Sequence, residues 1–511
     1  NLFGGFENSS IDRTRSWFRG WGYQYDKGGT PFYDYNVFKQ GKEENTNYYT
    51  NEATYTRSVA FFFMGTYSYK GIYTLTGTGR YEGTNRLGKS RSARWLPTWN
   101  VAGAWNVHEE KFYSNFTNPV LSHATLKASY SLTADRGPAF VTNSQAILNS
   151  YSPWRPSASV TESGMRITEL ENSELTYEKK HEFNVGIDLG FLKNRLNLAA
   201  DYYRRNNFDL IGVINTQGAG GTIAKYANIA SMKSSGIELT ISSKNMRTKD
   251  FSWNTDFIFS KTKNEITDLK SHANVLSLIS GNGFGREGYP VRGLFSIPFA
   301  GLTEDGLPTF INQDGQKTIS SFNFQEYEKL DFLKYEGPTD PTITGSFGNI
   351  LTYKNLKLNV FVTYSFGNVI RLDPVFSNAY SDLDAMPKEF KNRWMKAGDE
   401  NVTNIPTIVS TRMNQQYAYL NMAYNAYNYS DVRIADGGFI RLKEISLSYD
   451  LPAKVINFFR LNKLQLKLQA TNLCLLYADS KLNGQDPEFF RSGGVSTPVP
   501  KQFTFTVRLG L

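Results

Sequence analysis

Few residues of this chain combine a reactive side chain with neighbours spaced for chemistry. The four histidines, His108, His123, His181 and His272, are far apart in the sequence and lack the short spacings of metal-ligating motifs. Cys474 is the only cysteine, so it cannot form a disulfide within the chain. We therefore expect no metal site, no disulfide framework and no cofactor.

Four acidic residues could in principle supply acid–base chemistry: Asp382, Asp384, Glu389 and Asp399. Catalysis by a pair of carboxylates requires a defined separation between the two groups. The sequence around these four residues supplies no pattern that would set such a separation. We expect them to be solvated charges of a long loop.

Two glycine-rich segments and one acidic turn also resemble parts of known sites. Segments 281–285 and 218–221 could cradle a phosphate, but neither leads from a strand into a helix with the further acidic residue of the dinucleotide fingerprint. Asn312, Asp314 and Gly315 share residue types with a calcium loop but lack its 12-residue pattern. Ordinary loops and a turn are the expected structures, and no enzymatic activity is expected.

The aromatic residues of two long polar segments are the better candidates for binding. Aromatic rings stack on sugar rings or peptide side chains, and an arginine can fix the orientation of a ligand. Packing against neighbouring loops or a partner protein is the alternative role. The predicted substrate contacts are Tyr151, Trp154 and Arg155 in 135–180 and Tyr417 and Tyr419 in 369–437, where Tyr424, Tyr427 and Tyr429 lie nearby.

The composition limits the class of protein that could carry these residues. Aromatic residues make up 15% of the 511 residues, while hydrophobic residues make up 40% and the mean hydropathy is −0.43. No stretch approaches the roughly 18 to 20 apolar residues of a membrane-spanning helix. A membrane β-barrel remains possible, because only every second residue of its strands is apolar and aromatic girdles mark its interfaces. The 56 Lys and Arg against 47 Asp and Glu are scattered, which argues against nucleic-acid binding.

Strict alternation of apolar and polar residues recurs along the chain and indicates strands with one apolar face. Leu464, Leu466 and Leu468, for example, alternate with lysines and glutamines. A soluble sandwich would give the same alternation, so the period alone does not choose between the two folds. We count about 14 strands, at ~1–7, 55–69, 72–82, 95–107, 121–134, 181–191, 195–208, 236–243, 251–264, 343–353, 356–368, 438–450, 463–473 and 501–511.

Connection lengths favour the membrane barrel. Short turns, for example 70–71, 193–194 and 354–355, alternate with long polar segments. This alternation is typical of barrels with tight periplasmic turns and long external loops, whereas compact soluble domains rarely contain so many long loops. If the last strand runs inward, every long segment lies outside and Asn1 lies at the inner end of an outward strand. The chain is therefore predicted to be the C-terminal portion of a longer barrel. The long segments are 8–54, 83–94, 135–180, 209–235, 265–342, 369–437 and 474–500.

Several short blocks follow one another in an order typical of one family. The most distinctive are 439–449 (FIRLKEISLSY) with 451–452, 469–473 (QATNL) and 486–488 (DPE). The remaining blocks are 96–98 with Trp105, 178–179 with 184–186, 194–196 with 201–203, Asn228 with Met232, 235–238 with Trp253, and 393–394 with 398–399 and 405–406. In these blocks the chain resembles the SusC family, the large TonB-dependent outer-membrane transporters that pair with SusD-like lipoproteins. Tyr177, 81–83 and Leu511 depart from the family's usual residues.

The resemblance implies a fold, a function and partners. Family barrels have about 22 strands closed around a plug, so residues 1–511 would be the C-terminal part of the barrel, without the plug and the N-terminal extension. The resemblance implies that a plug-bearing N-terminal fragment completes the barrel in outer-membrane lipid. TonB would act on that missing part, and a SusD-like lipoprotein lid would deliver a glycan or an oligopeptide. The alternatives are a TonB-dependent siderophore or vitamin receptor without a lid and an outer-membrane barrel enzyme.

Overall fold

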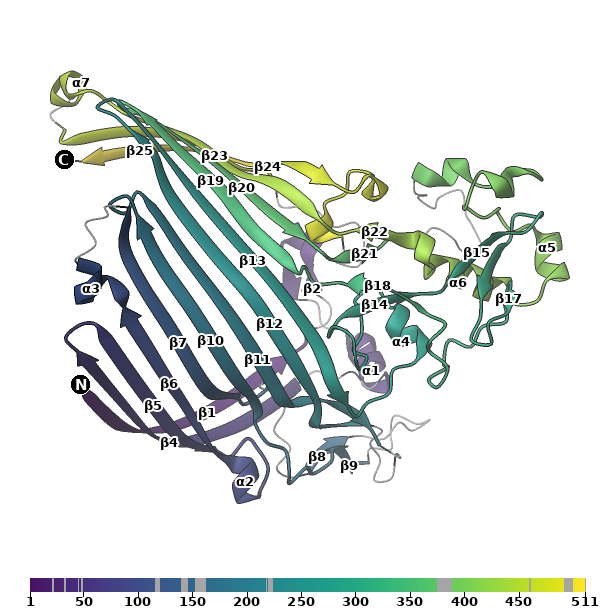
Figure 1. The fold of residues 1–511 in the computed structure, drawn as a ribbon. Coiled ribbons are helices and arrows are strands. Elements are labelled where there is room, and N and C mark those ends of the chain that lie inside the picture. Colours follow the sequence, from purple (N-terminus) through teal and green to yellow (C-terminus); the bar gives the residue numbers. More distant parts are fainter. Residues whose placement is uncertain are drawn as a thin grey trace.

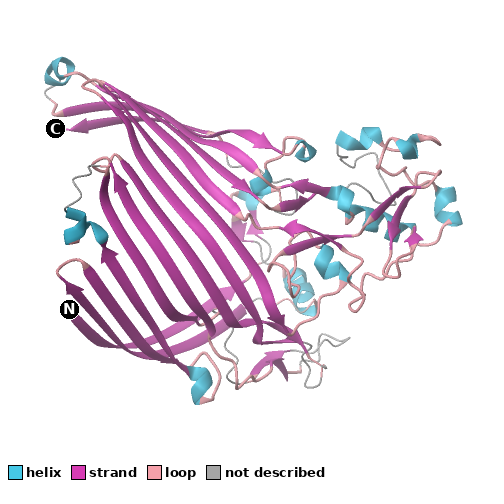
Figure 2. Cartoon of the chain, in the orientation of Figure 1, coloured by secondary structure: helices cyan, strands magenta, loops and turns pink. Residues whose placement is uncertain are grey.

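The computed structural model describes most of the chain and consists mainly of one large antiparallel sheet (Figures 1 and 2). Its fourteen strands follow one another in chain order, each beside the next. The described residues are 1–511 without 21–22, 32–33, 45, 47–48, 115–119, 139–145, 152–161, 217, 219–223, 375–387, 459–460, 491–499 and 511.

All fourteen predicted strands are present, in the predicted order. They are β1 (Leu2–Phe18), β4 (Tyr49–Tyr69), β5 (Tyr73–Thr84), β6 (Trp95–Asn106), β7 (Leu121–Asp135), β10 (Glu178–Phe191), β11 (Leu196–Asn215), β12 (Ala224–Arg247), β13 (Phe251–Leu269), β19 (Ile343–Tyr353), β20 (Leu356–Phe366), β23 (Phe439–Asp450), β24 (Lys463–Ala478) and β25 (Gln502–Gly510). The tight turn 354–355 joins β19 to β20, as the sequence indicates.

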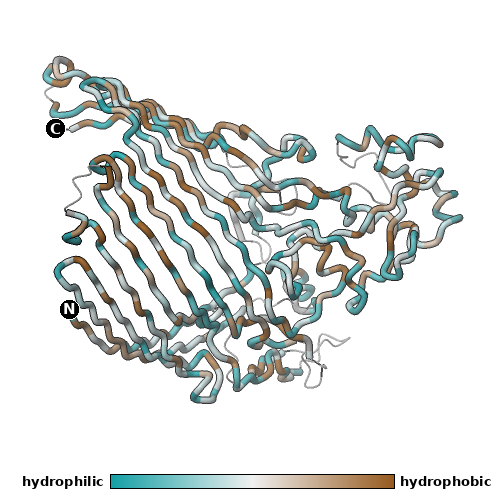
Figure 3. The backbone as a smooth tube through the Cα atoms, in the orientation of Figure 1, coloured by the Kyte–Doolittle hydropathy of each residue, from teal (hydrophilic) through white to brown (hydrophobic). Residues whose placement is uncertain are grey.

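The register of the sheet gathers apolar side chains on one face. Leu466 stands opposite Tyr449 on β23 and Val507 on β25, so the apolar positions of three strands share that face. Leu468 is 58% exposed, and Leu464 and Leu466 are half-buried, so none of the three packs under a second sheet. Figure 3 shows hydrophobic and hydrophilic residues alternating along these strands. The alternation is that of a transmembrane barrel wall, apolar toward lipid and polar toward the lumen.

The two ends of the sheet differ sharply. The short connections, with α3 (Lys111–Ser114) and α7 (Ala453–Phe458), lie at the end where both termini lie, and the long connections fold beyond the opposite end (Figure 1). In the part of the chain that the structure describes, no helix has the length and apolar character needed to cross a membrane.

The remaining elements are β2 (Tyr23–Gln24), η1 (Tyr25–Lys27), β3 (Thr30–Pro31), α1 (Tyr35–Glu43), α2 (Arg91–Arg94), η2 (Val107–Glu109), β8 (Ile147–Tyr151), β9 (Gly164–Glu169), α4 (Val275–Ile279), β14 (Gly293–Ser296), β15 (Phe299–Leu302), β16 (Pro308–Ile311), β17 (Lys317–Thr318), β18 (Lys334–Pro338), β21 (Val369–Arg371), η3 (Lys388–Asn392), η4 (Asp399–Asn401), α5 (Thr411–Gln416), α6 (Leu420–Asn428), η5 (Asp431–Arg433), β22 (Ile434–Asp436), η6 (Ser480–Leu482) and η7 (Pro487–Phe489).

Several strands are longer than predicted, so the prediction that 8–54 and 209–235 are loops is wrong in part. β1 continues to Phe18, β11 to Asn215, and β12 begins at Ala224. These extensions lie on the side of the long connections, beyond the apolar band. Because both faces of a strand meet water there, the alternation that reveals a strand in the membrane is no longer required.

The long segments 265–342 and 369–437 are also not simply polar loops. Together they form one external unit with its own hydrophobic core (Figure 1). We call this unit the head. Its core draws side chains from both segments, which are far apart in the sequence. The buried members are Ala273, Val275, Leu278, Ile279, Phe295, Ile297, Leu307, Phe310, Phe322, Leu330, Leu333, Leu420, Ala423, Tyr424, Ala426 and Tyr427.

Candidate functional site

Several charged side chains on the inner face of the sheet form ion pairs. On β10, Glu182 is bonded by Lys180 at 2.7 Å and by Arg205 of β11 at 3.1 Å. Lys127 of β7 pairs with Asp188 of β10 in the same way. These ion pairs make this part of the wall polar, which suits a surface past which a polar solute moves.

An arginine cluster lies on the inner face near the external end of β5. Each carboxylate oxygen of Glu82 accepts from one arginine, Oε2 from Arg80 Nε at 2.8 Å and Oε1 from Arg136 Nε at 2.8 Å. Arg80 Nη1 also bonds Glu7 of β1 at 2.9 Å, which ties the first strands of the sheet together. With Arg86, these side chains line a pocket of about 540 Å³. The cluster is a rigid, charged part of the barrel mouth.

One buried arginine holds the two halves of the head together. Arg371 donates to the carbonyl oxygens of Ile279 at 3.0 Å, Phe295 at 2.6 Å and Ser430 at 3.1 Å. Its guanidinium also lies 5.6 Å from the ring centre of Tyr429. Burial lowers the pKa of Arg371 to about 10, so it stays protonated at neutral pH. The hydrogen bonds of Arg371 therefore hold segments 265–342 and 369–437 together as one folded unit.

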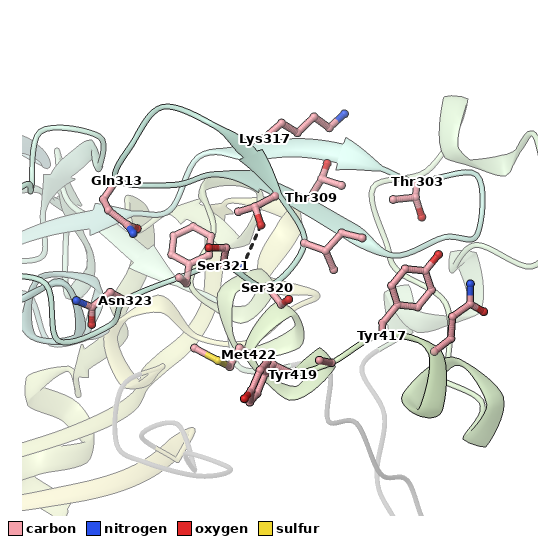
Figure 4. Close-up of a pocket in the computed structure, with 15 residues that line it drawn as sticks. Thr303, Thr309, Gln313, Lys317, Ser320, Ser321, Asn323, Tyr417, Tyr419 and Met422 are labelled. Carbon is pink, nitrogen blue, oxygen red and sulfur yellow. Dashed lines mark hydrogen bonds between the residues drawn. The ribbon is translucent and has the colours of Figure 1, made fainter.

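The head carries a pocket of about 920 Å³ between the β15–β17 sheet and the junction of α5 with α6 (Figure 4). Two of the predicted contacts, Tyr417 and Tyr419, line it. The Tyr417 hydroxyl donates to Asp305 Oδ2 at 3.1 Å, and this hydrogen bond raises the pKa of Tyr417. Tyr419, at the residue before α6, has a left-handed φ of 62° and is 70% exposed. Both tyrosines therefore lie on one pocket surface, and their predicted contact with substrate stays a prediction.

The rest of the pocket lining is rich in hydroxyl and amide groups. It includes Thr303, Thr309, Gln313, Thr318, Ser320, Ser321, Asn323 and Gln416, and its charged member is Lys317. Gln313 Oε1 is buried and has no hydrogen-bond partner among the described residues. An unpaired buried acceptor of this kind costs about 1–3 kcal/mol. Neutral donors and acceptors beside two aromatic rings can bind a hydroxyl-rich or amide-rich molecule.

The other predicted contacts do not join this pocket. Tyr151 lies at the end of β8, 41% exposed, with the Arg166 guanidinium 5.5 Å from its ring centre. Trp154 and Arg155 lie outside the described residues, so their predicted role remains a prediction. Tyr424 and Tyr427 are buried in the core of the head, where packing and not ligand contact is their role.

The weaker sequence candidates have structural explanations where the structure describes them. Asn312 Oδ1 accepts from the backbone N–H of Asp314 at 3.1 Å and of Gln316 at 2.9 Å, so this segment is a turn, as predicted. His108 and His123, distant in sequence, have ring centres 4.2 Å apart at the short-turn end. No group of three or more potential metal ligands occurs in the described part of the chain.

Sequence reasoning missed most of the pocket lining and all of the Arg371 contacts. The hydroxyl and amide residues of 303–323 carry no periodic signal, and their convergence with α5 and α6 depends on the core of the head. Residues 303–323 are rich in Thr, Ser, Asn and Gln, and this composition is the signal that could have drawn attention to the segment.

The sheet, its apolar outer face and its charged inner face define an outer-membrane β-barrel. The family model described as TonB dependent receptor-like, beta-barrel matches residues 2–473, so the chain belongs to this family. A TonB-dependent receptor P3 of Formosa agariphila is 25% identical over 463 residues, covering 86% of this chain and 42% of the relative. The TonB-dependent receptor SusC of Bacteroides thetaiotaomicron is 26% identical over 495 residues, covering 90% and 44%.

A solved structure gives the same fold. The RagAB peptide transporter structure superimposes with a TM-score of 0.73 at 22% identity, covering 90% of this chain and 48% of that chain. The chain thus spans less than half the length of these relatives. The two sequence relatives are named as receptors and the solved structure as a transporter.

Proposed function

We propose that this chain takes part in TonB-dependent import of oligomeric nutrients, either glycans or oligopeptides, across the outer membrane. The observation that carries the proposal is the head pocket, in which Tyr417 and Tyr419 face hydroxyl and amide groups on the external side. Below it, the paired charges of the inner wall give a polar path. Capture by the head and passage along the wall need differential binding and conformational change, with no covalent chemistry.

The open edges of the sheet support a second part of the proposal. β1 and β25 are the two edge strands of the described sheet, each paired on one side only. Unpaired backbone groups cost several kcal/mol each in lipid, so further strands must complete the barrel. We propose that the plug-bearing N-terminal part of the same transporter supplies them and that TonB acts on that part.

A SusD-like lipoprotein is the proposed lid over the external mouth. Support comes from the resemblance to SusC and from the size of the head, which projects beyond the barrel where a lid would sit. The head also exposes aromatic side chains that a partner protein could cover, such as Tyr327 (60% exposed) and Tyr419. A siderophore or vitamin receptor would work without such a lid.

Purification of the tagged protein from outer membranes in mild detergent tests the proposal. We expect a surface lipoprotein and a plug-bearing polypeptide to co-purify, and a photocrosslinker at Tyr327 to capture the lipoprotein. Recovery of the barrel with its plug but without any lipoprotein would favour the siderophore or vitamin alternative. Mass spectrometry of released ligand separates glycan from peptide cargo, and hydrolysis of either by the purified protein would favour the enzyme alternative.

A further inference from the structure

The short connections at the inner end of the barrel are strongly basic. In the residues that the structure describes, these connections, 70–72, 107–114, 120, 192–195, 248–250, 354–355, 451–458 and 461–462, contain seven Lys or Arg against three Asp or Glu. The whole chain has a far more even balance of 56 to 47. We call these connections the inner rim. Its excess positive charge needs an explanation that the import path does not give.

Two hairpins of the inner rim repeat the same side-chain arrangement. Lys70 Nζ lies 5.0 Å from the ring centre of Tyr69, and Lys354 Nζ lies 5.4 Å from that of Tyr353. Both tyrosines belong to the apolar outer face of the sheet and are 47% and 55% exposed. Each hairpin therefore places an aromatic ring toward lipid and an exposed ammonium group just beyond it.

Three lysines of these turns have a strained backbone conformation. Lys70, Lys193 and Lys354 have φ values of 53°, 59° and 51°, in the left-handed region that favours glycine or asparagine. A residue held in such a conformation is a pointer to function. Lysine at three of these turns has no advantage for chain reversal, so its advantage must come from the side chain.

Hydrogen bonds join the neighbouring turns into one continuous structure. The backbone N–H of Lys354 donates to Asp250 O at 2.7 Å. Arg195 Nη2 donates to Lys244 O at 3.2 Å and to Asn245 O at 3.1 Å, which links the β10–β11 hairpin to β12. The turns 192–195, 248–250 and 354–355, which carry several of these cations, are thus held at fixed positions along the barrel edge.

The apolar band of β13 sets the depth of the inner rim in the membrane. On the outer face of this strand, Phe251, Trp253, Phe257 and Phe259 are followed by Lys261 and Lys263. The outer-face positions from 251 to 259 are apolar apart from Thr255, and this stretch has nearly the length of a tilted membrane-spanning strand of about 9–11 residues. Lys249 and Lys354 lie just before this band begins, and therefore at the headgroup level of the inner leaflet.

We propose that the inner rim is a binding surface for the phosphate groups of inner-leaflet phospholipids, with preference for anionic headgroups. The lysines supply the ammonium groups and the adjacent tyrosines fix the interface, as aromatic belts do. Basic residues near an anionic leaflet gain attraction that falls off within a Debye length. A lipid surface fits better than a single soluble anion, because the cations are spread along an edge and do not converge on one pocket.

Native mass spectrometry of the purified transporter with added lipid tests this proposal. Phosphatidylglycerol should remain bound in preference to phosphatidylcholine of the same acyl chains. The double variant Lys70→Gln/Lys354→Gln should lower the apparent affinity for phosphatidylglycerol about fivefold for each lysine removed. Lys70→Arg/Lys354→Arg keeps the charges and should bind as the parent protein does.

A matched control lies at the other end of the membrane band. Lys261→Gln/Lys263→Gln removes the same number of charges from the external side and should leave phosphatidylglycerol binding unchanged. Equal retention of the two lipids by the parent protein would overturn the proposal, as would undiminished phosphatidylglycerol binding by the glutamine double variant. A loss of the same size in the external control would also contradict it, because the binding would then follow overall charge and not the inner rim.

Discussion

An arginine placed on the outer face of β24 should be costly in proportion to its depth in the membrane. With a rise of about 3.3 Å per residue and a tilt of about 40°, each residue of a barrel strand advances by about 2.5 Å across the bilayer. Leu468 lies five residues after Lys463, the first residue of β24 at the short-turn end, so it is about 13 Å into an apolar band about 25 Å tall. Leu464 lies one residue in, near the interface.

The expected costs follow from these depths. Leu468→Arg should lower the free energy of unfolding by about 2–4 kcal/mol, and Leu464→Arg by about 0–1 kcal/mol. Gln469→Arg, one residue further on, places the arginine on the inner face and should change stability little. Denaturant titration of the assembled barrel in phospholipid vesicles measures these values. Equal costs at Leu468 and Gln469 would refute the assignment of the two faces.

Three further predictions concern the head. Arg371→Met leaves three buried carbonyl oxygens without their donor. The free energy of opening measured by hydrogen exchange should therefore fall by at least about 3 kcal/mol in β14 and stay unchanged in the barrel strands. Unchanged exchange in β14 would contradict the role given to Arg371. Burial raises the pKa of Tyr427 from 10.0 to about 12, so its stabilisation is complete below pH 10 and is lost as the pH rises toward 12, by at most about 2–3 kcal/mol. Proteolysis of the head should show this loss in the parent protein and not in Tyr427→Phe, and an equal loss in both would disprove the assignment. Tyr419→Ala should slow nutrient uptake by cells, whereas Val402→Ala, which shortens an 83% exposed side chain of the head outside the pocket, should not; equal effects would place Tyr419 outside the cargo path.

The transmembrane strands could be predicted because the bilayer imposes a strict pattern on them. Leu464, Leu466 and Leu468 alternate with polar residues since one face meets lipid and the other meets the lumen. Outside the bilayer this constraint ends, which is why the extension of β12 from Ala224 escaped prediction. The turn at 354–355 was visible from its brevity and its polar residues.

The head could not be predicted because its core is assembled over long distances in sequence. Phe295 and Tyr424 pack in the same core although more than a hundred residues separate them. Their segments have no regular period, and polar residues between them suggest loops. Tyr417 and Tyr419 were proposed as contacts from residue type alone, whereas the position of Gln313 in the same pocket depends on a turn that only the fold reveals.

Cysteine labelling of intact cells tests the central claim most directly. In a Cys474→Ser background, a single cysteine is placed either in the head, by Val402→Cys, or in the inner rim, by Lys249→Cys. A membrane-impermeant maleimide should label the head cysteine on intact cells and the inner-rim cysteine only after the outer membrane is permeabilised. Labelling of the inner-rim cysteine on intact cells, or protection of the head cysteine until permeabilisation, would contradict an outer-membrane barrel with its head outside.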